Sequence, residues 1–116
     1  MLVYPILTQA QDVKIILFGD SLMAGYGLDS SLHLDRLLEK DLLDKGITSQ
    51  ITNASVSGDT SNGGLNRLSW SLQDDYDLFI LGLGANDMLR GISPDTTKAN
   101  LEEIIKIVQK KVFLFF

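Results

Sequence analysis

Three polar turns in this sequence carry groups that could do nucleophilic chemistry. Ser21 follows an apolar run closed by a glycine, Gly58 lies in a second turn, and Asn86 lies in a third. A serine at a strand-to-helix turn presents its hydroxyl near the positive end of that helix, where a nucleophile and a developing oxyanion are both favoured. A glycine leaves its backbone N–H open to a ligand, and an asparagine amide is a donor that does not titrate. Together the three groups could surround one tetrahedral oxyanion.

Each of these turns also has an ordinary structural explanation. Gly-Asp-Ser turns without catalysis are common, and Gly58-Asp59 alone is more often just a turn. Asn86-Asp87 alone is more often helix capping. The chemical interpretation therefore depends on the three turns occurring together.

Alternating strand and helix patterns would bring these turns to one place. The continuous apolar run over 14–18 is typical of a parallel strand buried on both faces. Weaker strand patterns follow, and helical spacing of apolar residues separates them. The strands are expected over 50–54, 78–83 and 112–116, and the helices over about 31–45, about 63–72 and from Pro94 through Val108. This order predicts an α/β fold with about four parallel strands, three helices covering both faces, and ligands at the carboxyl ends of the strands.

Composition narrows the class of protein. The chain has 116 residues, which suits one domain, and its 10 Lys+Arg against 15 Asp+Glu give a net charge of −5. That balance argues against nucleic acid and anionic membrane as partners. No cysteine and a single histidine, His33, exclude a disulfide framework, a thiolate zinc site and a multi-histidine metal site. No apolar run approaches the roughly 18 residues of a membrane span.

The three turns resemble the sequence blocks of the SGNH hydrolases, also called GDSL esterases, and in particular their bacterial arylesterase, thioesterase and lysophospholipase branch. The blocks are Phe-Gly-Asp-Ser-Leu-Met-Ala-Gly-Tyr-Gly over 18–27, Asn-Ala-Ser-Val-Ser-Gly-Asp-Thr over 53–60, and Gly-Ala-Asn-Asp over 84–87, followed by Leu89-Arg90-Gly91. Their order and spacing match from residue 14 to about residue 111. The resemblance implies a three-layer, flavodoxin-like fold and a serine hydrolase for carboxylic esters, acyl thioesters or lysophospholipids.

The resemblance also implies roles for single residues. Ser21 is the nucleophile, and its backbone N–H, the N–H of Gly58 and the side chain of Asn86 form the oxyanion hole. Loop-fixing hydrogen-bond acceptors are expected at Asp20, Asp59 and Asp87. No metal or organic cofactor is implied, since acyl transfer by a serine uses only groups of the protein. Acyl or aryl binding, or else core packing, is expected of four apolar residues near the rim: Leu22, Met23, Tyr26 and Met88.

One part of the family pattern is missing. Members continue through a fifth strand and a final helix, and carry an Asp-x-x-His block with the histidine base, which this sequence lacks. A serine hydroxyl without a base is a poor nucleophile at neutral pH. His33, at the start of the first predicted helix, is expected to be an ordinary helix histidine. We therefore expect residues 13–116 to form a hydrolase-like domain that is C-terminally incomplete and weakly active or inactive alone.

The two ends of the chain carry further expectations. Residues 1–12 are predicted to be an N-terminal extension or the remnant of an export signal, because residues 1–10 are apolar and end small-x-small. A signal remnant would make the protein periplasmic or secreted; otherwise it is cytoplasmic. The last apolar run has no polar end, so Phe113, Phe115 and Phe116 are expected at or near a sheet edge, where a second copy could associate.

Three alternatives from other classes fit parts of the sequence. A phospho-acceptor receiver domain would use Asp20 and Asp87 as metal and phosphoryl positions, but the first strand lacks a paired-acid ending. Dinucleotide binding would use Gly82-x-Gly84, but Asp87 stands where the third glycine belongs. A non-catalytic module could keep the oxyanion pocket as a ligand site.

Overall fold

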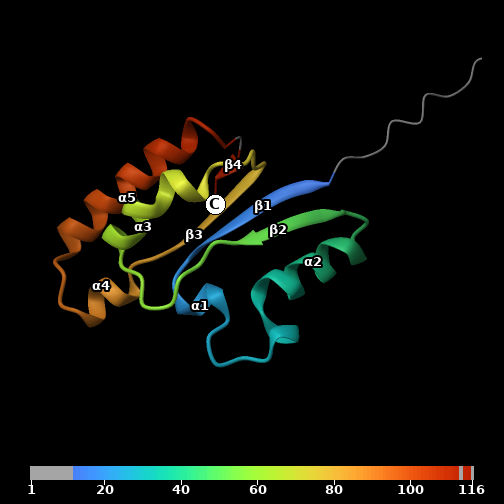
Figure 1. The fold of residues 1–116 in the computed structure, drawn as a ribbon, viewed down its shortest axis with the longest axis horizontal. Helices are drawn as coiled ribbons and strands as arrows, with labels where there is room; N and C mark the ends of the chain where they lie inside the picture. The colour runs from blue at the N-terminus through green and yellow to red at the C-terminus, as the bar shows by residue number, and fades with distance from the viewer. Residues whose placement is uncertain (1–11, 113, 116) are drawn as a thin grey trace, which may run out of the picture.

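A four-stranded parallel sheet forms the middle of the molecule (Figure 1). The computed structural model describes residues 12–112 and 114–115. The strand order is β2-β1-β3-β4, with β1 at Val13–Gly19, β2 at Ser49–Asn53, β3 at Leu78–Gly82 and β4 at Leu114–Phe115. The predicted parallel α/β sheet is confirmed, with strand boundaries within two residues of those expected.

The pairing register brings the carboxyl ends of three strands together. Leu17 of β1 lies opposite Asn53 of β2, and Gly19 of β1 lies opposite Gly82 of β3. The turns that follow these strands therefore leave the sheet at one edge. That edge is where ligands bind in open parallel sheets.

Three longer helices cover the two faces of the sheet. Figure 1 shows α3 (Ser61–Ser71) and α5 (Pro94–Gln109) side by side on one face, and α2 (Leu34–Asp44) on the other, against β2. This arrangement is the predicted three-layer, flavodoxin-like fold. A parallel connection needs a crossover of this kind, because the chain must return to the start of the next strand.

The hydrophobic core lies mainly between the sheet and the pair α3 and α5. Phe18 of β1 and Phe79 of β3 are fully buried there, with ring centroids 5.3 Å apart. The other fully or nearly fully buried members are Ile16, Leu68, Leu72, Ile104, Val108 and Val112. Ile15 and Leu17 alternate with these along β1 and are also buried, which explains why the strand reads as one continuous apolar run.

Two short helices and a 3₁₀ turn were not predicted. Helix α1 (Ser21–Ala24) and helix α4 (Ala85–Leu89) follow β1 and β3 directly, and Ser30–Leu32 forms the 3₁₀ turn η1. The three predicted helices are present as α2, α3 and α5, and α1 and α4 come in addition because elements of three to five residues are too short to show a hydrophobic period. The first long helix begins at Leu34 rather than near residue 31, because His33 is extended between η1 and α2. The next helix begins two residues early, at Ser61, where the Thr60 side chain accepts a hydrogen bond from the Gly63 N–H.

The structure tests only part of what the sequence predicts for the two ends of the chain. Strand β4 pairs with β3 at the edge of the sheet, as expected of residues 112–116, while Phe113 and Phe116 lie outside the described residues. Residues 1–11 lie outside them too, so the extension or export signal stays a prediction, as does the domain boundary at residue 13. Within the described residues, no helix is long and apolar enough to cross a membrane.

Candidate active site

Ser21 lies at the first position of helix α1, directly after β1. The chain turns there because the buried Asp20 caps the helix: its carboxylate accepts a hydrogen bond from the Leu22 N–H at 3.0 Å. Gly25, with φ of 81°, ends the helix, and its N–H donates to the Ser21 carbonyl. The half-buried Ser21 hydroxyl has no hydrogen-bond partner among the described residues. Its backbone N–H, at the start of a helix, has no acceptor within that helix.

Gly58 occupies a tight turn after β2. The Asp59 N–H donates to the Val56 carbonyl at 3.2 Å, and Gly58 has a φ of 81°, as at the third position of a type II turn. A side chain would be strained there, which explains the glycine. In the described part of the chain, the Gly58 N–H has no hydrogen-bond partner. The Val56 N–H donates to the Gly19 carbonyl at 3.0 Å, so this turn is held against the end of β1, next to α1.

Asn86 reaches the same turn from helix α4. Its Nδ2 donates to the backbone carbonyl of Asp59 at 3.0 Å, and the amide group has a second N–H. Gly84, with φ of 124°, precedes α4 and lets the chain turn sharply out of β3. The structure therefore joins Asn86 to the Gly58 turn directly, and joins that turn to the strand that carries Ser21.

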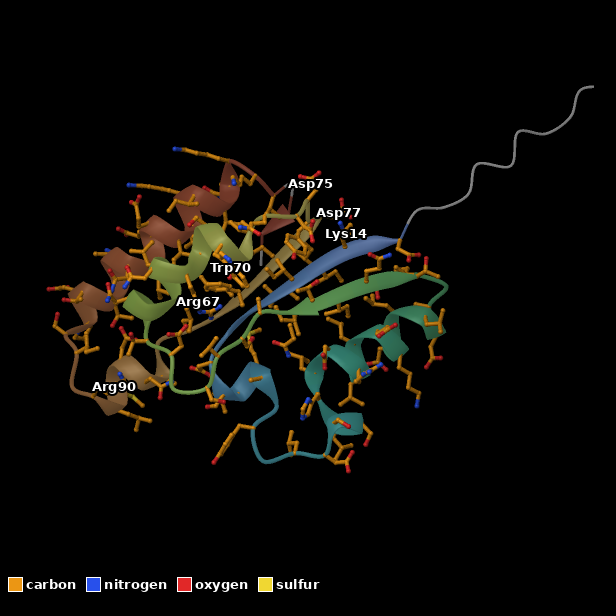
Figure 2. All side chains as sticks on the ribbon, viewed as in Figure 1. Lys14, Arg67, Trp70, Asp75, Asp77 and Arg90 are labelled. Carbon is orange, nitrogen blue, oxygen red and sulfur yellow. The ribbon has the colours of Figure 1, made fainter. Side chains whose placement is uncertain are left out.

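Arg67 is a residue of this site that sequence reasoning missed. From the middle of α3 its guanidinium donates to the Asp59 carboxylate at 2.6 Å, to the Ala54 carbonyl at 2.5 Å and to the Gly19 carbonyl at 3.2 Å. The guanidinium also lies over the Phe18 ring, 3.9 Å from its centroid. Figure 2 shows Arg67 between α3 and the sheet. Its partners lie 8, 13 and 48 positions away along the chain, so no local pattern in the sequence indicates this role.

Asp87 anchors α4 to α3 and α5, the two helices on the face of the sheet that holds the core, called the packed face below. It is 1% exposed, and its carboxylate accepts hydrogen bonds from the N–H and hydroxyl of Ser61 and from the Thr97 hydroxyl. Asn100 completes the group by donating to the Ser61 hydroxyl at 3.0 Å. Burial by itself would raise the pKa of Asp87, but the hydrogen bonds from Ser61 and Thr97 outweigh it and hold the pKa below its ordinary value.

These contacts confirm the loop-fixing role expected of the three aspartates. Asp20 caps α1, Asp59 accepts from Arg67, and Asp87 binds α3 and α5 to α4. A carboxylate engaged in this way holds backbone in place. The receiver-domain alternative, which needs Asp20 and Asp87 open to a metal ion and a phosphoryl group, therefore conflicts with both environments.

The His33 ring contacts the loop that follows α1. Its Nε2 lies 3.2 Å from the Leu28 carbonyl, and its ring packs on Gly25, where even a methyl group would clash. Within the described residues, no hydrogen bond joins its ring to Ser21. The expectation that His33 is not the base agrees with this placement.

The apolar residues at the rim divide into two kinds. Met23 packs on Gly19 and Gly82, which leaves no room for a side chain at either glycine. This packing explains why residue 82 is a glycine, so the dinucleotide-binding alternative is not needed to explain it. The packing role was wrong for the other three, because Leu22 and Tyr26 are each 80% exposed and Met88 is 74% exposed. A groove of about 660 Å³ runs between α4 and α5, lined by apolar side chains that include Met88, Ile92, Leu101 and Ile105.

Among the described residues, no group of three or more His, Cys, Asp or Glu side chains is placed so that it could hold a metal ion. The acidic groups near Ser21 are engaged with backbone, hydroxyl or guanidinium donors instead. What the arrangement offers is a serine hydroxyl and neutral N–H donors at one edge of the sheet.

Comparison with known proteins gives consistent matches. The chain is 44% identical over 94 residues to the esterase TesA of Pseudomonas aeruginosa and 40% identical over 97 residues to an arylesterase of Vibrio mimicus. The alignments cover 80% and 83% of this chain but 47% and 48% of those proteins, so the chain spans about half the length of the curated relatives it matches. Among solved structures, the SGNH-hydrolase family esterase AlinE4 superposes with a TM-score of 0.84 at 41% identity, over 92% of this chain and 60% of that one.

A family model, that of the GDSL-like lipase/acylhydrolases, matches residues 17–114. This range contains the three turns that the structure brings to the same edge of the sheet. The chain belongs to the GDSL-like lipase/acylhydrolase family.

Proposed function

We propose that these residues carry the nucleophile and the oxyanion hole of a serine hydrolase that cleaves carboxylic or thio esters through an acyl-enzyme. The observation that carries the proposal is the open N–H of Gly58, held beside the Asn86 amide at the edge where Ser21 follows β1. Oxyanion stabilisation requires donors that are fixed before the reaction. Four sets of hydrogen bonds hold this turn, from the side chains of Arg67, Asn86 and Arg90 and from the Val56 backbone.

The reaction proceeds in two halves. The Ser21 Oγ attacks the carbonyl carbon of the ester while its proton passes to a base, and the carbonyl oxygen becomes an oxyanion. The N–H groups of Ser21 and Gly58 and the side-chain amide of Asn86 donate to that oxyanion. Its collapse expels the alcohol or thiol, which takes up the proton. Water then attacks the acyl group on Ser21 by the same route and releases the carboxylic acid.

The base is the group that these 116 residues do not supply. The sequence has one histidine and no Asp-x-x-His block, and the His33 ring is bonded to the Leu28 carbonyl. Oxyanion stabilisation and binding without a working triad still leave acceleration of roughly 10³–10⁴ over water, and that acceleration does not require the serine. We therefore expect at most weak turnover from this chain alone.

The substrate class follows from the rim and from the relatives. Exposed Leu22, Tyr26 and Met88 and the apolar groove between α4 and α5 suit an acyl or aryl group. The relatives are named an esterase, an arylesterase and, in Escherichia coli, a thioesterase and lysophospholipase. Export of the protein and association through β4 remain predictions beside this one.

Hydrolysis of p-nitrophenyl butyrate by the purified chain tests the proposal, with Ser21→Ala as the matched variant. We expect a slow release of p-nitrophenol and a butyryl group on Ser21, found by peptide mass spectrometry and missing from Ser21→Ala. A butyryl group on other serines and none on Ser21 would contradict the role of Ser21. Turnover as fast as that of a complete esterase would contradict the statement that the base is missing.

A further inference from the structure

We propose that Arg90 is a positioning residue, whose guanidinium holds the Gly58 turn against α4 so that the Gly58 N–H and the Asn86 amide keep one common orientation. The inference rests on the proposed function, because it concerns the donors of the same oxyanion hole. It goes beyond that function by assigning a role to a side chain outside the nucleophile and the donors.

The contact comes from the end of the helix that carries Asn86. The Arg90 Nη2 donates to the Gly58 carbonyl at 2.9 Å, while the Arg90 backbone N–H donates to the Asn86 carbonyl at 3.0 Å. Arg90 directly follows α4, as Figure 2 shows. One short segment therefore supplies both the side-chain donor of the site and a bond to the turn that carries the backbone donor.

The geometry of the turn explains why that bond controls the Gly58 N–H. Glycine has the widest conformational freedom, and the peptide unit that bears the Gly58 N–H has no bond of its own within the described residues. The next peptide unit is held on both sides: its N–H, from Asp59, bonds to Val56, and its carbonyl, from Gly58, accepts from Arg90. Without Arg90, only the Val56 side would hold that plane, and rotation about Gly58 would redirect the open N–H.

Arg90 differs from Arg67 in a way that separates positioning from stability. Arg67 is largely buried, with a side chain 21% exposed and bonds to three groups. Arg90 is exposed, and among the described residues it forms no salt bridge. Exposed side chains of this kind contribute little to the stability of a fold. Loss of the Arg90 guanidinium should therefore loosen the turn and leave the fold intact.

The test compares Arg90→Met, which keeps the apolar stem and removes the donor, with Arg90→Lys, which keeps a cation able to reach a carbonyl. Arg36→Met, at an exposed arginine on α2, is the control. The readouts are the second-order rate of fluorophosphonate labelling at Ser21, the ¹H–¹⁵N heteronuclear NOE of the Gly58 amide, and the thermal midpoint. We expect Arg90→Met to slow labelling about tenfold and to lower the Gly58 NOE, because small misplacements of a catalytic group cost large factors in rate. Arg90→Lys should recover most of both, with the thermal midpoint unchanged in all variants.

Labelling at the wild-type rate by Arg90→Met, with an unchanged Gly58 NOE, would overturn the proposal. A slower rate that follows a fall in thermal midpoint and is not restored by Arg90→Lys would also overturn it, since the role would then be structural. Failure of the unsubstituted chain to label at Ser21 would count against the proposed function instead. In that case the Gly58 NOE decides the role of Arg90 on its own.

Discussion

The two faces of the sheet are built very differently. On one face, α3 and α5 bury Leu68, Ile104 and Val108 completely against β1 and β3. On the other, α2 has no fully buried residue, and its Leu37 and Leu43 are 43% and 58% exposed. The polar anchors of the candidate site follow the same division, because Arg67, Ser61 and Thr97 all come from the packed face.

This difference shows how the fold positions the site. Donors for an oxyanion must be held rigidly, and rigidity is greatest where side chains are close-packed. The turn at Gly58 and helix α4 are both tied to α3, through Arg67 and through Ser61. The α2 face makes a lighter connection, through the Asn53 amide, which donates to the Met23 carbonyl of α1 at 2.9 Å.

The largest expected difference between the faces is in packing. Leu68→Ala should lower the free energy of unfolding by about 3 kcal/mol, because it leaves a cavity among fully buried side chains. Leu37→Ala on α2, at a position 43% exposed, should cost less than about 1 kcal/mol. Urea denaturation of both variants measures this. Equal losses would mean that the two faces do not differ in the way described.

The next effect concerns the buried polar group. Asp87→Asn keeps the size of the side chain but replaces one of its acceptor oxygens with an N–H₂ donor, facing Ser61 and Thr97 donors. We expect a loss of about 2 kcal/mol, the cost of leaving buried donors unpaired. Asp41→Asn, at an exposed site on α2, should change stability by less than about 0.5 kcal/mol. If Asp87→Asn left the free energy of unfolding unchanged in the same urea experiment, Asp87 would not be the group that anchors α4.

A smaller effect is the pH dependence of the same group. The pKa of Asp87 is lowered from the ordinary 3.8, so the unfolded chain binds its proton more tightly than the folded one. The stability that Asp87 contributes is therefore fully present above its unfolded pKa, and is lost as pH falls through the folded pKa. Stability measured from pH 6 downward should fall less steeply below about pH 4 in Asp87→Asn than in the unsubstituted chain. If stability fell with pH equally steeply in the two proteins, Asp87 would not contribute to the loss of stability in acid.

Most of the fold could be predicted because its signals are local. The apolar run of β1 and the helical stripe at Leu101, Ile104 and Val108 fixed the type of each element before any tertiary contact was known. Helices α1 and α4 could not be predicted, since four or five residues carry no period and these turns form through caps and tertiary bonds. The extended conformation of His33, which delays α2, has the same origin.

The site could be predicted from the sequence only where its residues belong to short motifs of adjacent residues. Asp20, Gly58 and Asn86 stand in short motifs, and their local turns form as the motifs indicate. Arg67 acts through groups up to 48 positions away in sequence, and Thr97 reaches Asp87 across two elements. Such contacts exist only once helices pack on the sheet, so no spacing rule could have named them. Exposure of Leu22 and Tyr26 likewise depends on how α1 lies on the finished edge.

The central claim is that Ser21 is a nucleophile placed at an oxyanion hole. The most direct test is to treat the folded chain with a fluorophosphonate and locate the phosphonyl group by peptide mass spectrometry. Ser55 and Ser57 serve as internal controls. They lie in the neighbouring turn, and the proposed oxyanion hole is not assigned to either of them. We predict a single adduct on Ser21, which does not form when the chain is unfolded in urea before treatment and forms much more slowly in Asn86→Ala. Adducts spread over several serines, or labelling of Ser21 at the same rate in the unfolded chain, would contradict the account.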